Sequence, residues 1–595
     1  MIKDRINKLR KLMQDREIFA YIIPSSDYHQ SEYVGDYFKS REYISGFEGS
    51  AGTVVVTMEE AGLWTDGRYF IQAEQELQGS DIKLFKMGVE DVPTIEEYLI
   101  EKMPKNSILG FDGKVMSAKE GKDLEDKLSF KNISIKFDKD LVDMIWEERT
   151  SLPQNKAFLL GTEYSGVSFS EKLKRVREEL KKQKATMNIL TTLDDVAWLF
   201  NIRGRDIQCN PVVLAYAVVG LKEVNLFIDE SKLTDEIKIE LDKENVIIRA
   251  YDELYEFVKT IDEEEIVLID PNKINYAVYG NLASIRKIEK DNPTLLFKAI
   301  KNEIELKNIR NSHINDGVAF TKFMYWLKNN ISKEDINELT ASNKLQSLRE
   351  QQDKFIEPSF TSISAYKEHA AIMHYRPTEE NSYKLEAKGL YLIDSGGQYL
   401  DGTTDITRTM ALGEITKQEE TDFTNVLRGM IRLSKAKFLH GCRGYNLDIL
   451  ARGPMWDNAI NYRSGTGHGI GFVLNVHEAP NGFRWNVVPE RNDSCVLEEG
   501  MVTTNEPGIY IEGSHGIRIE NEIVVRKAEK NEYGQFMNFE VITFAPIDLD
   551  AINPELMLRD EIDYLNQYHE QVYNKISPFL TKEEQEWLKQ YTRKI

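Results

Sequence analysis

The sequence predicts a mixed α/β protein of several domains, with its functional residues in the last third of the chain. The chain has 595 residues, which is long enough for three or four domains. Over the first half, strand-like and helix-like segments alternate, which is typical of α/β domains. Near residue 300 this pattern changes to a long segment with helical spacing of its apolar residues, followed by mixed helices and strands. These observations predict two α/β domains followed by a larger α+β domain.

Residues 1–150 are predicted to form the first α/β domain. The segment opens with a charged, helix-like stretch that lacks the apolar core of a signal peptide. Strands are expected over 18–24, 52–57 and 82–85, because each is a short apolar run rich in β-branched or aromatic residues. Helical stretches separate them. Residues 150–154 are expected to form a linker to the next domain.

Residues 155–300 are predicted to repeat this plan as a second α/β domain. A helix is expected over 168–184, where apolar residues recur at helical spacing. Strands are expected over 212–219 and 266–270, which are nearly continuous apolar runs. The first two domains therefore look like diverged copies of one fold.

The third predicted domain covers residues 301–595. The segment 303–327 has helical periodicity and should open this domain, and mixed helices and strands continue to about residue 548. The tail from about residue 552 is expected to be helical and to form a packing helix pair as a C-terminal extension of the domain.

Charge and composition argue against several classes of function. The net charge of −22 would repel the phosphates of nucleic acid, so no nucleic-acid partner is expected. No run of 18 apolar residues occurs, so no membrane span is expected. The cysteines are too few and too scattered for a disulfide framework or a thiolate metal site, which favours a reducing, cytoplasmic compartment. They are Cys209, Cys442 and Cys495.

Four carboxylates and one histidine in the last third have spacings that would hold two metal ions. They are Asp394, Asp405, His468, Glu506 and Glu520. Asp394 ends an apolar run that is typical of a buried strand. Glycines and an Asp-Gly pair follow it, so the chain should turn back and bring Asp405, on a returning strand over 403–409, beside Asp394.

The other three candidate ligands also follow or lie within strand-like segments. His468 lies between glycines, which would let backbone approach an ion closely. Glu506 ends a strand just before a Pro-Gly pair. Glu520 is expected on the strand 517–520, on the face opposite the isoleucines. Any one of these acidic residues alone would more often be a solvated surface group, but all five in this order favour a metal site.

Two divalent ions would neutralise the four carboxylates, which repel one another when the site is empty. A water between two such ions loses a proton near neutral pH and becomes a nucleophile. Oxygen ligands with a single nitrogen suit manganese, with cobalt and zinc as alternatives. The residues alone therefore predict a dinuclear hydrolytic centre.

Six segments of the last third together resemble the catalytic domain of the pita-bread metallopeptidases, the superfamily of aminopeptidase P, prolidase and methionine aminopeptidase. They are residues 391–399, 401–409, 465–471, 475–478, 505–508 and 516–521. Further similarity at 44–52 and 64–70 extends the resemblance over most of the chain, and its length is similar to that of the long, three-domain cytosolic aminopeptidase P branch. This resemblance implies two creatinase-like N-terminal α/β domains, a pita-bread catalytic domain with a helical C-terminal extension, and a homodimer.

The resemblance also implies a role for each ligand. Asp405 and Glu520 would bridge the two ions, Asp394 would bind one ion, and His468 and Glu506 would complete the other. A hydroxide bound between the two metal ions would attack the scissile carbonyl. Glu506 would also move a proton from the nucleophile to the leaving nitrogen, as the matching glutamate is thought to do in the family.

Residues around the ligands are expected to contact the substrate. The resemblance implies that His374 and His477 line the cleft, with His477 on the oxyanion and His374 near the leaving nitrogen. Buried structural histidines are the alternative. Arg518 should either orient a metal-binding carboxylate or shape the substrate pocket. Ser464 departs from the family, because many relatives have a histidine at that position.

The predicted activity is hydrolysis of the N-terminal Xaa-Pro bond of peptides. The Xaa-Pro amide is tertiary and has no N–H, so a general aminopeptidase site that binds that N–H fails on it. Prolidase, which shares all five ligands but cleaves only dipeptides, is the nearest alternative. Chain length, the duplicated N-terminal domains, the C-terminal extension and the spacing of His468 and His477 favour the aminopeptidase. A non-catalytic binding protein and a metal-free creatinase-type hydrolase are disfavoured by the intact ligand set.

Overall fold

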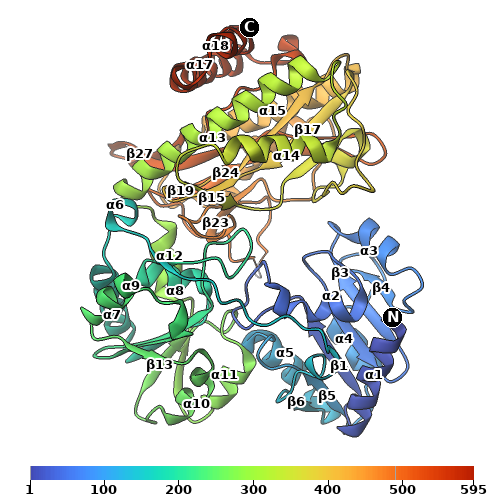
Figure 1. Cartoon of the computed structure of the whole chain (residues 1–595), viewed down its shortest axis with the longest axis vertical. Coiled ribbons are helices and arrows are strands. Elements are labelled where there is room, and N and C mark those ends of the chain that lie inside the picture. Colours follow the sequence, from blue (N-terminus) through green and yellow to red (C-terminus); the bar gives the residue numbers. More distant parts are fainter. Residues whose placement is uncertain (1, 489–490) are drawn as a thin grey trace. The chain divides into compact units, whose positions relative to one another are not determined.

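The computed structural model describes residues 2–488 and 491–595, and the chain forms two compact units. The first unit comprises Met1–Leu159, Ser168–Gln208 and Val212–Thr294. The second comprises Leu160–Val167, Cys209–Pro211 and Leu295–Ile595. Figure 1 shows the first unit mainly in blue to light green and the second mainly in yellow to red.

The first unit contains a six-stranded sheet built from residues of the first predicted domain, in the order β4-β3-β2-β1-β5-β6. Its strands are β1 (Ala20–Pro24), β2 (Thr53–Thr57), β3 (Ala61–Thr65), β4 (Lys83–Lys86), β5 (Ile108–Phe111) and β6 (Ser134–Lys136). The helices are α1 (Ile2–Asp15), α2 (Ser40–Ser45), α3 (Phe70–Glu76), α4 (Ile95–Lys102) and α5 (Ala118–Leu128). Successive strand residues point to opposite faces. Tyr21 and Ile23 therefore join one apolar core, while Ile22 and Ala20 join another.

A second six-stranded sheet in the same unit has the order β12-β11-β10-β8-β13-β14. Its strands are β8 (Met187–Leu190), β10 (Ala215–Gly220), β11 (Val224–Ile228), β12 (Ile247–Arg249), β13 (Ile266–Ile269) and β14 (Arg286–Glu289). Nearby elements are α7 (Phe169–Gln183), α8 (Leu193–Phe200), β9 (Ile202–Arg203), which pairs with β7 (Phe158–Leu159), α9 (Asp235–Asp242), α10 (Leu254–Phe257) and α11 (Tyr276–Asn281). Helix α12 (Pro293–Ala299) begins in the first unit, and its residues from Leu295 on belong to the second.

The two sheets share one topology, which confirms the predicted duplication. In each sheet the three strands β1-β2-β3 or β8-β10-β11 pair antiparallel in that order. In the first sheet, β4 pairs in parallel with β3 at one edge, and β5 and β6 follow in parallel beside β1 at the other. In the second sheet, β12 pairs in parallel with β11, and β13 and β14 follow in parallel beside β8. Residues 149–157, which include the expected linker, lie outside any helix or strand.

A buried polar cluster joins the two halves of the first unit. The imidazole of His29 lies 2.7 Å from the carbonyl oxygen of Thr191 and 2.6 Å from the hydroxyl of Tyr251, and its ring stacks on Tyr216. Burial lowers the pKa of His29, so the ring is neutral and one of these contacts is a donated hydrogen bond. Asn275 adds a hydrogen bond from its side-chain amide to the backbone of the first half.

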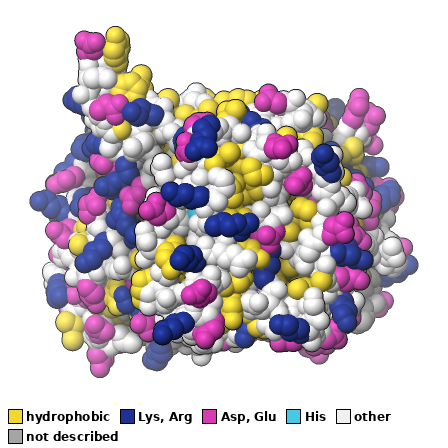
Figure 2. All heavy atoms as spheres, turned by 90° about the horizontal axis from the view of Figure 1, so that it is seen from above, with side chains coloured by type: hydrophobic (Ala, Val, Ile, Leu, Met, Phe, Trp, Pro, Cys, Tyr) yellow, Lys and Arg dark blue, Asp and Glu magenta, His cyan; other side chains and the backbone are white. Residues whose placement is uncertain are grey.

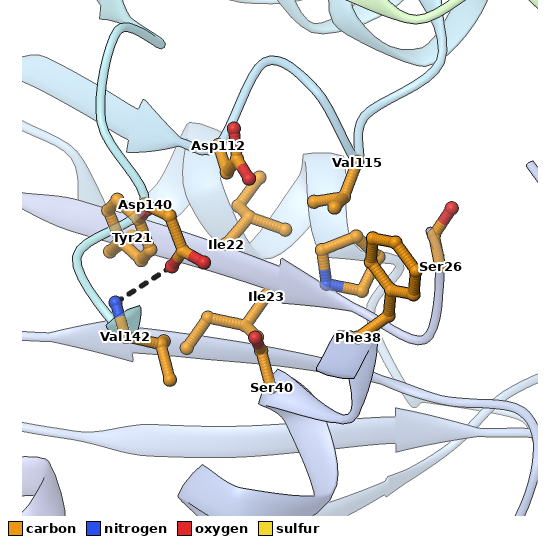
Figure 3. A pocket seen from close by; sticks show the side chains of 11 residues that line it. Tyr21, Ile22, Ile23, Ser26, Phe38, Ser40, Asp112, Val115, Asp140 and Val142 are labelled. Atoms are coloured by element: carbon orange, nitrogen blue, oxygen red, sulfur yellow. Dashed lines mark hydrogen bonds between the residues drawn. The ribbon is translucent and has the colours of Figure 1, made fainter. Parts of the chain in front are cut away.

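A small cavity of about 10 Å³, room for a single water, lies beside β1 in the first unit. Figure 3 shows Asp112 and Asp140 on its lining, from different segments of the chain. Asp112 is 7% exposed, and only its Oδ1 accepts a hydrogen bond, from the backbone of Lys114 at 2.9 Å. Within the described residues its Oδ2 has no hydrogen-bond partner.

The second unit contains a six-stranded sheet of order β21-β28-β27-β24-β22-β23. Its strands are β21 (Phe438–Leu439), β22 (Gly467–Gly469), β23 (Glu478–Phe483), β24 (Val502–Asn505), β27 (Asn521–Asn531) and β28 (Gly534–Val541). Three smaller sheets complete it, made of β15 (Phe355–Pro358), β18 (Gly397–Tyr399) and β19 (Gly402–Thr403); of β16 (Ile363–Tyr366), β17 (Leu390–Ser395) and β20 (Ile406–Ala411); and of β25 (Gly508–Ile511) and β26 (His515–Arg518).

Helices pack around these sheets and enclose an extensive apolar core. They are α6 (Thr162–Ser165), α13 (Glu303–Asn330), α14 (Glu338–Arg349), α15 (Lys417–Ser434), α16 (Gly444–Trp456), α17 (Arg559–Ile576) and α18 (Lys582–Tyr591). The core contains residues of α13, α14, α15, β17 and β20. Helix α13 begins where predicted, because Asn302 and Glu305 form a capping box. The C-terminal helices contribute Leu565, Trp587 and Leu588 to the same core, which confirms a packing helix pair.

The surface is mixed in charge. On the face shown in Figure 2, acidic and basic side chains are interspersed, with hydrophobic groups between them. The excess of negative charge is therefore not gathered there into one acidic surface. Across residues 2–488 and 491–595, no helix combines the length and apolar character needed to cross a membrane.

Candidate active site

Asp394 and Asp405 lie side by side on an antiparallel strand pair. Strand β17 pairs with β20 so that Asp394 is opposite Thr407 and Ser395 is opposite Ile406. Asp394 lies inside β17, and Asp405 immediately precedes β20, so the turn between them brings both carboxylates to one end of the pair. The predicted returning strand 403–409 is interrupted at Asp405. The backbone N–H of Asp405 donates to the side chain of Glu522 at 2.8 Å instead.

His468 is the central residue of β22, and the glycines beside it have a steric role that was not predicted. A Cβ at Gly467 would lie 1.9 Å from the carbonyl oxygen of Thr504, and one at Gly469 would lie 2.2 Å from that of Glu478. These glycines are therefore required by the close approach of the neighbouring strands. The prediction that they let backbone approach an ion closely stays a prediction beside this steric reason.

The hydrogen bonds of His468 fix which ring nitrogen is available as a ligand. Its Nδ1 lies 2.9 Å from the carbonyl oxygen of Gly469, so in the neutral ring Nδ1 carries the proton. Nε2 then presents a lone pair and lies 3.3 Å from Oε1 of Glu506 and 3.6 Å from Oδ2 of Asp405. A lone pair facing carboxylate oxygens at this distance is favourable with a cation or a proton between them.

Glu506 and Glu520 lie at strand ends and are held by threonine hydroxyls. Glu506 follows β24 directly, and its Oε1 accepts a hydrogen bond from Thr504 at 3.0 Å. The same Thr504 oxygen accepts the backbone N–H of His468 at 3.0 Å. Glu520 lies between β26 and β27, because the predicted strand 517–520 ends at residue 518. Its Oε2 accepts from Thr407 at 2.7 Å.

Donor atoms of three of the five predicted ligands converge as a divalent cation requires. One ligand atom each from Asp405, His468 and Glu520 lies within 4.8 Å of the others. Among the residues that the structure describes, Oδ1 of Asp394, Oδ1 of Asp405 and Oε1 of Glu520 are buried without a hydrogen-bond partner. Three orphaned carboxylate oxygens in one buried site fit cation binding, since an unpaired buried charge is otherwise costly.

Burial raises the pKa of Asp405 well above its usual range, and the charges of Asp394 and Glu506 add to this effect. Burial likewise raises the pKa of Glu520, and the negative charge of Asp405 raises it further. Without cations these carboxylates repel one another. A bound divalent ion would lower these pKa values again, because its positive charge favours the ionised carboxylates.

Arg518 pairs with one of the candidate ligands. Its Nη2 lies 2.5 Å from Oδ2 of Asp394, its Nη1 donates to the hydroxyl of Tyr510 at 2.6 Å, and its Nε donates to Thr407 at 3.2 Å. The guanidinium is buried and held at three points. Of the two predicted roles, these contacts favour the orientation of a carboxylate.

The two predicted substrate histidines occupy different segments. The ring of His477 packs edge-on against His468, with 4.2 Å between the ring centroids. His374 follows the short helix η7 (Lys367–Ala371), which packs against β17 and β26. Ser464 accepts a hydrogen bond through its backbone carbonyl from Arg452 at 2.7 Å, so this position has a backbone contact of its own.

Several residues that support the ligands were not singled out from the sequence. Thr407 and Thr504 hold carboxylates, and Glu522 holds the backbone of Asp405 and lies 3.1 Å from Nε2 of His313. Their position beside the ligand motifs could have drawn attention to the two threonines and Glu522. His313 lies far away in the sequence, on α13, and gives no such signal.

Comparison with protein families matches most of the chain. The creatinase/prolidase N-terminal domain matches residues 5–140 and again, as a second model, residues 148–305. Metallopeptidase family M24 matches residues 307–527, and the C-terminal region of peptidase M24 matches residues 535–595.

Known relatives extend this match over the full length. Xaa-Pro aminopeptidase 1 of Dictyostelium discoideum is 41% identical, over 99% of this chain and 96% of its own length. The crystal structure of X-prolyl aminopeptidase from Caenorhabditis elegans, described as a cytosolic enzyme with a di-nuclear active site, superposes with a TM-score of 0.95 at 34% identity, covering 100% of both chains. Xaa-Pro dipeptidase from Bacillus anthracis shares the fold alone, with a TM-score of 0.53 at 24% identity, over 65% of this chain and 100% of its own.

The fold and the converging carboxylates define a metal-dependent peptidase with creatinase-type N-terminal domains and a pita-bread catalytic domain. The chain belongs to metallopeptidase family M24. Within that family, its full-length similarity is to the Xaa-Pro aminopeptidases.

Proposed function

We propose that this chain hydrolyses the N-terminal Xaa-Pro bond of peptides with the help of two divalent metal ions. The observation that carries the proposal is the convergence of Asp405, His468 and Glu520, together with the buried carboxylate oxygens of Asp394, Asp405 and Glu520 that have no hydrogen-bond partner among the described residues. It is supported by the full-length similarity to Xaa-Pro aminopeptidases and by the di-nuclear centre named for the solved relative.

The five predicted ligands would hold the ions, with manganese as the expected metal and cobalt or zinc as alternatives. Asp405 and Glu520 are proposed as the bridging ligands, because both are buried between the other acidic groups. Asp394 would bind one ion, and His468 and Glu506 would complete the other. When bound, the ions would supply an acidified water as the nucleophile and polarise the scissile carbonyl.

The residues of the chain would orient the substrate and move the protons. Glu506, held by Thr504, would accept the proton of the nucleophile and deliver it to the leaving nitrogen. His477, against the ring of His468, would donate to the oxyanion. His374 would contact the substrate near that nitrogen, and Arg518 would keep Asp394 in its binding orientation.

A comparison of three peptides tests this proposal and separates it from prolidase. Arg-Pro-Pro should be cleaved much faster than Arg-Pro, because the proline carboxylate of the dipeptide would enter a site already crowded with acidic ligands. Arg-Ala should be a poor substrate, since it lacks the pyrrolidine ring. Cleavage should require manganese. Dipeptide cleavage as fast as tripeptide cleavage would favour prolidase, and metal-independent cleavage would refute the proposed chemistry.

We further propose the predicted domain boundaries, 1–150, 155–300 and 301–595, with the C-terminal extension starting near residue 552. The repeated sheet topology and the irregular stretch 149–157 support them. Limited proteolysis that cuts first inside either sheet, rather than near the linker, would contradict the first boundary.

We propose a cytoplasmic homodimer that pairs through the catalytic domain. The solved relative is described as cytosolic, which supports the compartment. Exposed apolar side chains of the second unit support the pairing. They are Ile449, Trp456, Trp485 and Val487. A purely monomeric species in sedimentation velocity at micromolar concentration would contradict the dimer.

A further inference from the structure

We propose that Glu338 is a positioning residue that anchors the segment carrying His374. This inference rests on the proposed function, because it assigns a purpose to contacts around a residue that is proposed to meet the substrate. The segment 367–383, here called the His374 segment, consists of η7 and turns rather than regular structure. A segment of this kind needs specific contacts to hold one side chain in place.

A single buried carboxylate receives the hydrogen bonds that hold this segment. Glu338 is the first residue of α14 and is 0% exposed. It accepts the backbone N–H groups of Tyr366 at 2.6 Å and Tyr383 at 2.8 Å, and the hydroxyl of Tyr375 at 2.8 Å. Nδ1 of His369 lies 3.0 Å from each of its oxygens. These donors stand before, within and at the end of the His374 segment, so one carboxylate joins all three parts.

Aromatic stacking completes the anchor. The imidazole of His369 lies between two tyrosine rings, with centroid distances of 4.3 Å to Tyr375 and 3.7 Å to Tyr383, and both pairs are stacked. His369 is therefore held by two ring faces and by its contact with Glu338. The backbone of Glu338 adds a hydrogen bond from its N–H to the carbonyl oxygen of Tyr383 at 3.1 Å.

The anchor reaches His374 through its neighbour in the chain. Tyr375 follows His374 directly, its ring stacks on His369, and its hydroxyl ends on Glu338. On the other side, β16 leads into the segment and pairs with β17 so that Ile363 is opposite Asp394. Along the chain, His374 therefore lies between β16, which pairs with the strand that carries Asp394, and Tyr375, which the anchor holds in place. Fixing Tyr375 limits where the His374 ring can go.

The chemistry of the anchor requires a carboxylate. The four donor groups all offer protons, and a carboxylate accepts at both oxygens. Its charge is also favoured at the N-terminus of α14. In Glu338→Gln the side chain keeps its size, but its amide nitrogen is a donor and faces groups that are donors themselves. About half of the contacts would therefore be lost without a change in volume.

A double-mutant cycle tests the proposal. Glu338→Gln should lower kcat/KM on a proline tripeptide by about 10-fold, mainly through kcat, because misplaced groups weaken transition-state contacts. In a His374→Ala background the same change should cost less than about 2-fold, since its target is gone. Tyr375→Phe, which removes only the hydroxyl, should cause a smaller loss of kcat/KM, and this loss should likewise shrink in the His374→Ala background. Glu380→Gln, which removes an exposed acidic group of the same segment outside the anchor, is the control.

Two further measurements separate positioning from loss of structure. Bound metal should stay unchanged in Glu338→Gln, and amide exchange should speed up at Tyr366 and Tyr383 while β17 stays protected. Equal losses in both backgrounds, loss of metal, or a His374→Ala variant with full activity would each overturn the proposal. If Glu338→Gln does not fold, Tyr375→Phe decides on the same criteria. Absence of metal-dependent cleavage in the wild type would instead refute the proposed function.

Discussion

Replacing Asp112 by asparagine should flatten the pH dependence of the stability of the first unit. Burial raises the pKa of Asp112 from 3.8 to about 7, and the charge of Asp140 adds to the shift. The folded state therefore holds this proton more tightly than the unfolded chain does. Its contribution to stability is fully present below about pH 4 and is lost as pH rises through 7. The variant lacks this titration.

The size of the effect follows from the shift. A change in pKa from 3.8 to about 7 corresponds to about 4 kcal/mol of unfolding free energy between pH 4 and pH 8. Asparagine keeps an oxygen for the Lys114 N–H but places an amide nitrogen in the small cavity, at a cost of about 1–3 kcal/mol when unpaired. That cost is nearly independent of pH. The difference in slope between wild type and variant therefore isolates the carboxyl group.

Denaturant unfolding of the full chain at several pH values, read by amide exchange on β1 and β5, measures this slope. Glu101→Gln, which removes an exposed acidic group of the same domain, is the matched control and should keep the wild-type slope. The reasoning is wrong if Asp112→Asn loses stability with rising pH as steeply as the wild type does. A wild type whose first unit gains stability between pH 5 and pH 8 through this group would also refute the sign.

Three further predictions concern the candidate active site. Chelation should abolish activity and lower the melting temperature of the second unit, with manganese restoring both; a fully active metal-free protein, shown by elemental analysis, would contradict this. Glu506→Gln keeps an oxygen ligand but cannot carry a proton, so turnover should fall roughly 100-fold with metal content unchanged; turnover within a few-fold of wild type would leave Glu506 as a ligand only. Ser464→His should be tolerated, whereas His477→Ala should lower kcat/KM by roughly 100-fold; the reverse order of effects would show that the roles around His468 are misassigned.

Much of the fold could be predicted, because hydrophobic periodicity and turn residues are local signals. The strand expected over 266–270 is observed as Ile266–Ile269, and the helix expected over 168–184 as Phe169–Gln183. The shared topology of the two N-terminal sheets was foreseen only as a duplication, since strand order depends on pairings between distant segments.

In the candidate site, too, features set by local sequence could be predicted, and features set by contacts between distant segments could not. The ligand motifs are compact, so the residues that converge around His468 could be named from sequence. The interruption at Asp405 could not, because there the side chain of Glu522 replaces a strand partner. The one at Glu520 could not either, because its backbone N–H donates to the carbonyl oxygen of Thr407, which is distant in the sequence. The Glu338 anchor joins residues up to 45 positions apart through one carboxylate, which no local pattern reveals.

The single hydroxyl of Thr504 has a consequence for which substitutions this enzyme can accept. It accepts the N–H of His468 and donates to Glu506, so two candidate metal ligands depend on one oxygen atom. Valine has nearly the same shape as threonine and would fill the buried space equally well, yet it would remove both bonds. Serine would leave a small void but keep both. At this position a substitution that preserves volume should therefore cost more activity than one that does not, the opposite of the order expected for a core residue.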